Sequence, residues 1–188
     1  MKKLTLICGA PLSGKSTLAK QIAHDEGAMM METDVIRDWM KQIVPKVEGD
    51  ALFYDVDGPD EFYRVLDTAE KVMNGEIAQS EAIERGIWAL LKTHHKWDHL
   101  VFEGIAMVPR LMHEIDDEYP DVEVEKIVLV DADRERALSR IKKRGLWGPI
   151  GTYPEELIDR EIEWVVLYNQ WFEDQAREHN IPVRYIED

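Results

Sequence analysis

The chain has 188 residues, of which 45% are hydrophobic and 32% charged, the proportions of one ordinary globular domain. Its formal net charge of −15 argues against nucleic-acid or anionic-membrane partners, and no apolar run reaches the roughly 18 residues of a membrane span. A single cysteine, Cys8, cannot form an internal disulfide, so the composition favours a reducing cytoplasm.

The first predicted elements are a strand at 3–8, a glycine-rich turn and a helix at 15–26. The turn matches the phosphate-binding pattern G-x-x-x-x-G-K-[ST] at every fixed position. A glycine-rich turn that only opens a helix is the alternative, which the strand and helix on either side disfavour. We therefore predict that ATP is bound by Gly9, Ala10, Pro11, Leu12, Ser13, Gly14, Lys15, Ser16 and Thr17. Lys15 would contact the β- and γ-phosphates, and the Ser16 hydroxyl would ligate Mg²⁺.

A short strand at 28–32 and a helix at 34–43, with Thr33 as its N-cap, come next. Asp34 and Arg37 are three residues apart and so share one face of that helix. Asp34 would accept the proton of an attacking hydroxyl, and Arg37 would bind an acidic group of the acceptor. The alternative is an acid that complements the helix dipole beside a surface arginine. Their position directly after a strand favours the functional interpretation.

A loop over 44–59 and two helices, at 60–73 and 75–94, lead to a strand at 100–103. This strand ends in Glu103-Gly104, where the carboxylate would reach Mg²⁺ or a water bound to it. A strand-ending acid at a turn is the alternative. Arg85 and Arg160 are weaker candidates for acceptor contacts, since either would equally suit a surface salt bridge.

Pro109 begins a helix that extends to 118, and a nearly continuous apolar strand at 124–131 predicts burial on both faces. The helix at 134–144 presents Arg136, Arg140 and Arg144 as one ridge, because they are four residues apart. Residues 145–153 are glycine-rich and include Trp147, which predicts a lid over the transferring phosphate, with an ordinary loop as the alternative. A helix at 155–179 and a strand at 183–186 complete the chain.

Alternating strands and helices predict an α/β fold: a parallel five-stranded sheet with helices on both faces. The sequence therefore predicts one domain over 1–188, an α/β fold that carries a phosphate loop. Each candidate motif follows a strand, so the candidates would meet at the carboxyl edge of the sheet.

The motifs resemble the small phosphate-loop kinases, in particular 2-phosphoglycerate-kinase-like proteins, which are related to the zeta-toxin and polynucleotide 5′-kinase groups. The matching segments are 9–17 (GAPLSGKST), 32–37 (ETDVIR), 101–109 (VFEGIAMVP) and 140–145 (RIKKRG). The resemblance implies that Asp34 is the base, that Arg37 binds the acceptor, and that Arg140 and Arg144 hold phosphate. It also implies a phosphate-loop nucleoside triphosphate hydrolase fold of the nucleotide-kinase type with a lid. In such a fold a helical insertion at about 44–95 would build the acceptor pocket.

The leading hypothesis is an ATP-dependent kinase that phosphorylates a hydroxyl of a small, anionic metabolite such as 2-phosphoglycerate. A kinase of polynucleotide or nucleoside 5′-hydroxyls is one alternative, although the net charge of −15 disfavours a nucleic-acid partner. A nucleotide-dependent ATPase switch is another. The sequence does not indicate an oligomeric state.

Overall fold

The computed structural model describes residues 2–47, 50–53, 67–93, 97–131, 133–144 and 155–186, which build a five-stranded sheet. The strands are β1 (Lys2–Gly9), β2 (Met29–Glu32), β3 (His99–Glu103), β4 (Val122–Val130) and β5 (Val183–Tyr185). They lie in the order β2-β3-β1-β4-β5, and every neighbouring pair is parallel. The predicted α/β fold with a parallel five-stranded sheet is therefore confirmed.

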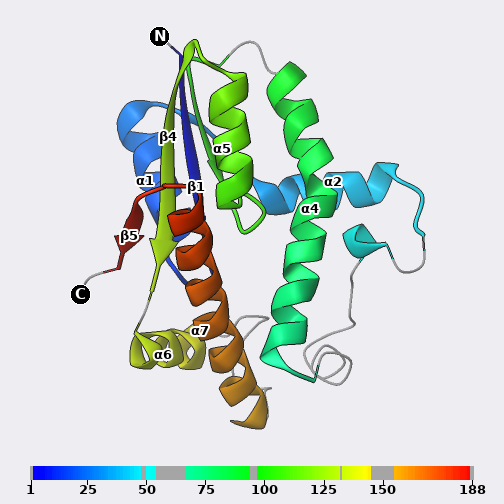
Figure 1. Cartoon of the computed structure of the whole chain (residues 1–188), viewed down its shortest axis with the longest axis vertical. Coiled ribbons are helices and arrows are strands. Elements are labelled where there is room, and N and C mark those ends of the chain that lie inside the picture. The colour runs from blue at the N-terminus through cyan, green and yellow to red at the C-terminus, as the bar shows by residue number, and fades with distance from the viewer. Residues whose placement is uncertain are drawn as a thin grey trace.

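Six helices and a short 3-10 turn flank this sheet within the described ranges. They are α1 (Lys15–Glu26), α2 (Thr33–Ile43), η1 (Ala51–Phe53), α4 (Ala69–Thr93), α5 (Pro109–Glu118), α6 (Arg134–Arg144) and α7 (Glu155–Glu178). Helix α1 covers one face of the sheet, and α5 and α7 cover the other, with α4 beside them (Figure 1).

Alternation along β1 explains why helices are needed on both faces. Leu4, Leu6 and Cys8 point into the larger core, which α4, α5 and α7 complete. Ile7 points the other way, into a smaller cluster completed by Ala19 of α1. All of these side chains are fully buried, so both faces of this central strand are shielded from solvent.

Helix α4 corrects one prediction from the sequence. Two helices were expected, at 60–73 and 75–94 with a break at Asn74, but one helix runs through Asn74 and Gly75 from Ala69 to Thr93. A glycine inside a helix costs about 1 kcal/mol, which burial can offset. Val72 before the glycine and Ile83 after it are both buried, so packing on both sides keeps the helix continuous.

Two smaller predictions also differ from the structure. Thr33 is the first residue of α2 and Glu32 is its N-cap, with no side-chain cap hydrogen bond. Strand β4 is buried on both faces only over its second half, because Glu123 and Glu125 alternate outward in the first half. The strand ends at Val130, so Asp131 lies just beyond it.

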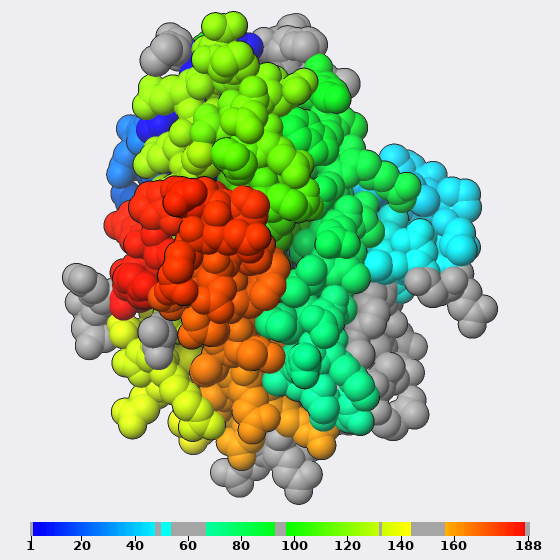
Figure 2. Space-filling view, viewed as in Figure 1, coloured from blue at the N-terminus to red at the C-terminus, as the bar shows by residue number. Residues whose placement is uncertain are grey.

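The C-terminal part of α2 and η1 project beside α4 (Figure 2). Large apolar side chains are exposed on and after this helix, at Trp39, Ile43 and Val47. No helix in the part of the chain that the structure describes is long and apolar enough to span a membrane.

Candidate active site

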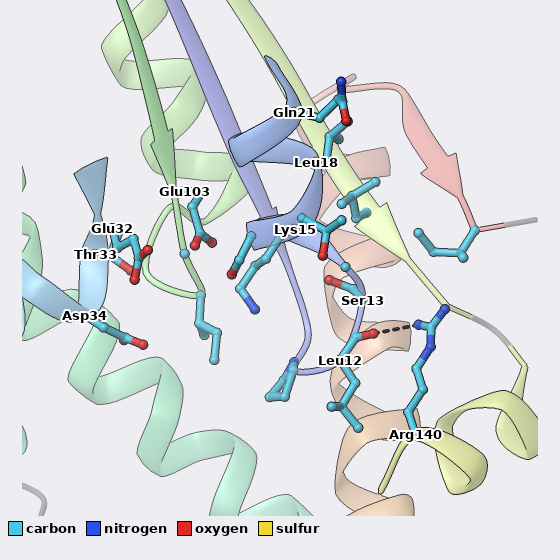
Figure 3. Close-up of a pocket in the computed structure, with 18 of the residues that line it drawn as sticks. Leu12, Ser13, Lys15, Leu18, Gln21, Glu32, Thr33, Asp34, Glu103 and Arg140 are labelled. Carbon is cyan, nitrogen blue, oxygen red and sulfur yellow. Dashed lines mark hydrogen bonds between the residues drawn. The ribbon is translucent and has the colours of Figure 1, made fainter. Parts of the chain in front are cut away.

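A pocket of about 1010 Å³ opens at the carboxyl ends of the strands. Residues 11–17 form its floor, and side chains from β2, α2, β3, α6 and β5 form its walls (Figure 3). Its volume is at the upper end of the range for small-molecule sites. The convergence of motifs at this edge of the sheet follows from the parallel strands.

The phosphate loop needs glycine at its first position. Gly9 has φ of 152°, and a Cβ there would collide with the Leu129 carbonyl and with Ser13 Oγ. Leu12 also adopts a left-handed conformation, with φ of 67°, although it is not glycine. The Ser13 amide donates to the Ala10 carbonyl at 3.3 Å and closes the turn.

Helix α1 begins at Lys15 directly after this turn, with Gly14 as an N-cap that offers no side chain. Its first backbone N–H groups therefore point toward the pocket without a side-chain cap, a ready arrangement for anions. Lys15, Ser16 and Thr17 all line the pocket. Gly9 and Ala10 lie behind the loop, since Gly9 ends β1 and Ala10 is fully buried.

Glu103 is a buried carboxylate at the end of β3. It is 3% exposed, and within the described residues its Oε2 has no hydrogen-bond partner. Burial raises the pKa of Glu103, while a hydrogen bond from Ser16 and the charge of Lys15 oppose that rise. Mg²⁺ prefers oxygen ligands and keeps few protein contacts beside substrate phosphates, so Glu103 and Ser16 fit it. No group of three or more His, Cys, Asp or Glu side chains that could hold a metal ion occurs among the described residues, at this site or outside it.

Gly104 allows the ends of β2 and β3 to approach each other. Its φ is 149°, and a Cβ at this position would collide with the Thr33 hydroxyl. Glu32 and Glu103 are register partners in the two strands, so two carboxylates stand side by side at the wall of the pocket. Figure 3 shows Glu32, Thr33 and Asp34 together on the side that faces Lys15.

Asp34 and Arg37 lie together as their spacing predicted. Arg37 Nη1 is 3.0 Å from Asp34 Oδ1, and Arg37 Nε is 3.1 Å from Asp38 Oδ1. The Asp34 side chain is 63% exposed and lines the pocket. Arg37 stands behind it, outside the pocket lining, so its contact with an acceptor stays a prediction.

Helix α6 places Arg140 against the phosphate loop. Arg140 Nη1 donates to the Leu12 carbonyl at 2.6 Å and to Asp131 Oδ2 at 2.8 Å. Figure 3 shows it on the far side of the loop from Asp34. Arg144 is the last residue of α6, and its side chain lies outside what the structure describes, as does the lid predicted over 145–153.

The two weaker candidates do not join the site. Arg85 of α4 and Arg160 of α7 are both exposed, and neither is among the residues that line the pocket. Parts of the predicted acceptor insertion at 44–95, namely 48–49, 54–66 and 94–96, also lie outside the described ranges. Its role in acceptor binding stays a prediction.

The structure adds residues that sequence reasoning missed. Asp131 follows β4 as Glu103 ends β3, and this shared position at a strand end was the available signal. Glu76 of α4 is beside the candidate site: burial raises its pKa to about 7, against the charges of Arg37 and Lys15. No local pattern in the sequence marks it, because its neighbours come from other helices.

The far end of the pocket is built from α1, β4 and β5. It is lined there by Leu18, Gln21, Leu129, Arg184 and Ile186. Figure 3 shows Leu18 and Gln21 on the side of α1 near β5 and away from Asp34. The two ends of the pocket are therefore lined by side chains of different chemistry.

Comparison with known proteins gives two informative similarities. No protein-family model matches the chain. The chain is 26% identical over 184 residues to 2-phosphoglycerate kinase of Methanopyrus kandleri, covering 96% of this chain and 55% of that protein. It therefore spans about half the length of this curated relative.

A solved structure shows the same fold. Shikimate kinase from Bacteroides thetaiotaomicron superposes with a TM-score of 0.57 at 13% identity, over 99% of this chain and 86% of that one. The strand order and the phosphate loop described above fit this likeness. The chain thus has the fold of the small P-loop kinases, and its predicted resemblance to 2-phosphoglycerate-kinase-like proteins is confirmed.

Proposed function

We propose that the chain is an ATP-dependent kinase that transfers the γ-phosphoryl group to a hydroxyl of a small, anionic metabolite. The observation that carries this proposal is one pocket lined by Lys15 and Ser16 of the phosphate loop, Asp34 and Glu103. This set supplies a cation for phosphate, oxygen ligands for a metal ion and a carboxylate for a proton.

Each residue has a distinct task in the proposed reaction. The loop N–H groups and Lys15 bind the phosphates and stabilise charge that develops during transfer. Glu103 and Ser16 would hold Mg²⁺, which neutralises phosphate charge when it is bound. Asp34 accepts the proton of the attacking hydroxyl, while Arg37 orients an acidic group of the acceptor.

We further propose that the acceptor is 2-phosphoglycerate or a similar phosphorylated acid. The support is the name of the relative from Methanopyrus kandleri, which is 26% identical to this chain. Arg37, which contacts Asp34 from outside the pocket lining, suits an acceptor that carries negative charge. A small acid also agrees with the net charge of −15, which disfavours long polyanions.

ADP release from ATP and Mg²⁺ tests the function against four acceptor classes. These are phosphorylated acids including 2-phosphoglycerate, sugars, nucleosides, and oligonucleotides with 5′-hydroxyl ends. We expect acceptor-dependent turnover with the phosphorylated acids. Turnover only with nucleosides or oligonucleotides would replace the proposed acceptor, and ATP hydrolysis without any acceptor would replace the kinase by an ATPase.

Lys15→Ala links that turnover to the pocket. The variant should lose nearly all activity, since a contact with developing charge contributes several kcal/mol to the barrier, on the order of 10²-fold or more in rate. Lys20→Ala on the exposed side of the same helix is the matched control and should keep the parent rate. Unchanged turnover of a folded Lys15→Ala protein would contradict the assignment.

A further inference from the structure

A chain of buried polar contacts connects α7 to the phosphate loop through Asp131. Its backbone N–H donates to Asn169 Oδ1 at 2.9 Å, and Asn169 in turn donates from Nδ2 to the Val165 carbonyl at 2.9 Å. Asp131 and Asn169 are 5% and 3% exposed. The Asn169 side chain, which is itself held by a hydrogen bond within α7, therefore fixes the backbone at the end of β4.

The Asp131 carboxylate then reaches two arginines of α6. Its Oδ2 accepts from Arg140 Nη1 at 2.8 Å, and its Oδ1 is 3.3 Å from Arg136 Nε. The same Oδ1 accepts the Asp133 N–H at 3.2 Å, in the turn that begins α6. A buried carboxylate with these partners holds the helix at a set distance from the strand end.

Arg140 carries this constraint to the loop. Its Nη1 also donates to the Leu12 carbonyl at 2.6 Å, and Leu12 is the non-glycine residue with φ of 67°. A left-handed leucine costs about 1 kcal/mol or more, so a fixed donor on its carbonyl stabilises that geometry.

Arg140 keeps donors for a ligand. A guanidinium has five N–H donors, and the hydrogen bonds that Arg140 makes to described residues both come from Nη1. Because Arg140 also lines the pocket, its Nη2 and Nε groups can donate to an anion that binds there.

We propose that Asp131 is a positioning residue, which clamps Arg140 by one nitrogen so that the phosphate loop is preorganised and the other donors meet phosphate. The part of the inference that concerns phosphate rests on the proposed function, whereas the part that concerns the loop does not. Asp131 does not touch the ligand in this arrangement and acts through Arg140.

The experiment has two independent readouts on Asp131→Asn, Arg140→Met and the double variant. The first is hydrogen exchange of the loop amides of residues 10 and 12–14 in the protein without ligand. The second is the dissociation constant of a non-hydrolysable ATP analogue with Mg²⁺, measured by calorimetry. Asp133→Asn is the matched control, because it loses the ion pair with Arg136 but keeps a capping side chain.

We expect Asp131→Asn to speed hydrogen exchange in the loop. It should also raise the dissociation constant of the ATP analogue about 10-fold, because a misplaced group binds less well. In the Arg140→Met background the same substitution should change affinity less than about 2-fold, because the clamped residue is gone. Asp133→Asn should leave both readouts at the parent values.

Equal effects of Asp131→Asn with and without Arg140, or unchanged loop exchange, would overturn the proposal in favour of a purely structural role. If the parent protein does not bind the analogue, the proposed function fails, and the exchange readout still decides whether Asp131 positions the loop. Should Asp131→Asn not fold, Arg140→Met breaks the same contact from the other side and must speed exchange in the loop.

Discussion

Arg37 and Asp34 form a contact of 3.0 Å between Nη1 and Oδ1, one turn apart on α2. The contact orients the Asp34 carboxylate at the rim of the pocket, where an acceptor hydroxyl would approach. The neighbouring Asp38 contacts the Nε of the same arginine at 3.1 Å but is not part of the pocket lining. These two carboxylates therefore share a partner and differ in what they face.

Asp34→Asn should lower kcat by about 10²- to 10⁴-fold and leave ATP binding nearly unchanged, because it removes a proton acceptor and keeps the size of the side chain. Steady-state kinetics with both substrates checks this. Asp38→Asn is the control and should keep kcat within about 2-fold. A variant that kept kcat and lost ATP affinity would show that Asp34 serves the nucleotide instead.

Arg37→Ala should raise the acceptor KM by about 10- to 100-fold, the value of a charge-assisted hydrogen bond, with a smaller change in the KM of ATP. Lys41→Ala, one turn further along α2, controls for the loss of a positive charge. If both variants raise the acceptor KM equally, Arg37 contributes only to the general field and not to a specific contact.

Glu76→Gln should stabilise the protein in a pH-dependent way. Burial raises the pKa of this carboxyl from 4.5 to about 7, so the folded state keeps a proton that the unfolded chain releases. This contribution to stability is complete below pH 4.5 and is lost as the pH rises to about 7. Relative to the parent, the variant should therefore gain stability over that interval, up to about 3 kcal/mol at pH 8.

Urea denaturation at several pH values measures the gain. Glu81→Gln provides the control, since Glu81 is exposed on the same helix. A stability difference between Glu76→Gln and the parent that does not vary between pH 5 and pH 8 would contradict the raised pKa of Glu76.

Gly104→Ala should destabilise the fold by more than Gly27→Ala. Both glycines have positive φ, of 149° and 64°, so each substitution carries a backbone cost of about 1 kcal/mol. At Gly27 a Cβ meets nothing within 4 Å, whereas at Gly104 it collides with Thr33. The extra cost should be about 1–3 kcal/mol by denaturant titration. Equal losses would mean that Thr33 moves aside without cost.

The sequence was sufficient for the sheet and for the phosphate loop, since both depend on local signals. A glycine pattern, the apolar strand before it and the helical spacing after it lie within about 25 residues. The same signals placed Glu103 correctly at the end of β3 and Asp34 correctly in the first turn of α2. They failed at Asn74, where the predicted break between two helices was overridden by packing of distant side chains against α4.

Contacts between distant segments were beyond the reach of a single sequence. Arg140 is separated by 128 positions from Leu12, and no spacing rule connects them. Asp131 was interpreted as the end of a strand because its partners, Arg140 and Asn169, come from two later helices. Their spacing placed Arg136, Arg140 and Arg144 on one ridge, but the sequence did not reveal that Asp131 contacts two of them.

Cys8 is fully buried in β1, and burial raises the pKa of its thiol far above the usual range, so the thiolate that reacts with alkylating reagents is scarce. No other cysteine occurs in the 188 residues. Thiol reagents should therefore leave the native chain unmodified. A cysteine introduced on an exposed helix would then be the site that carries a fluorophore or spin label. Two such cysteines would give the distance between two labelled sites without first removing a native residue.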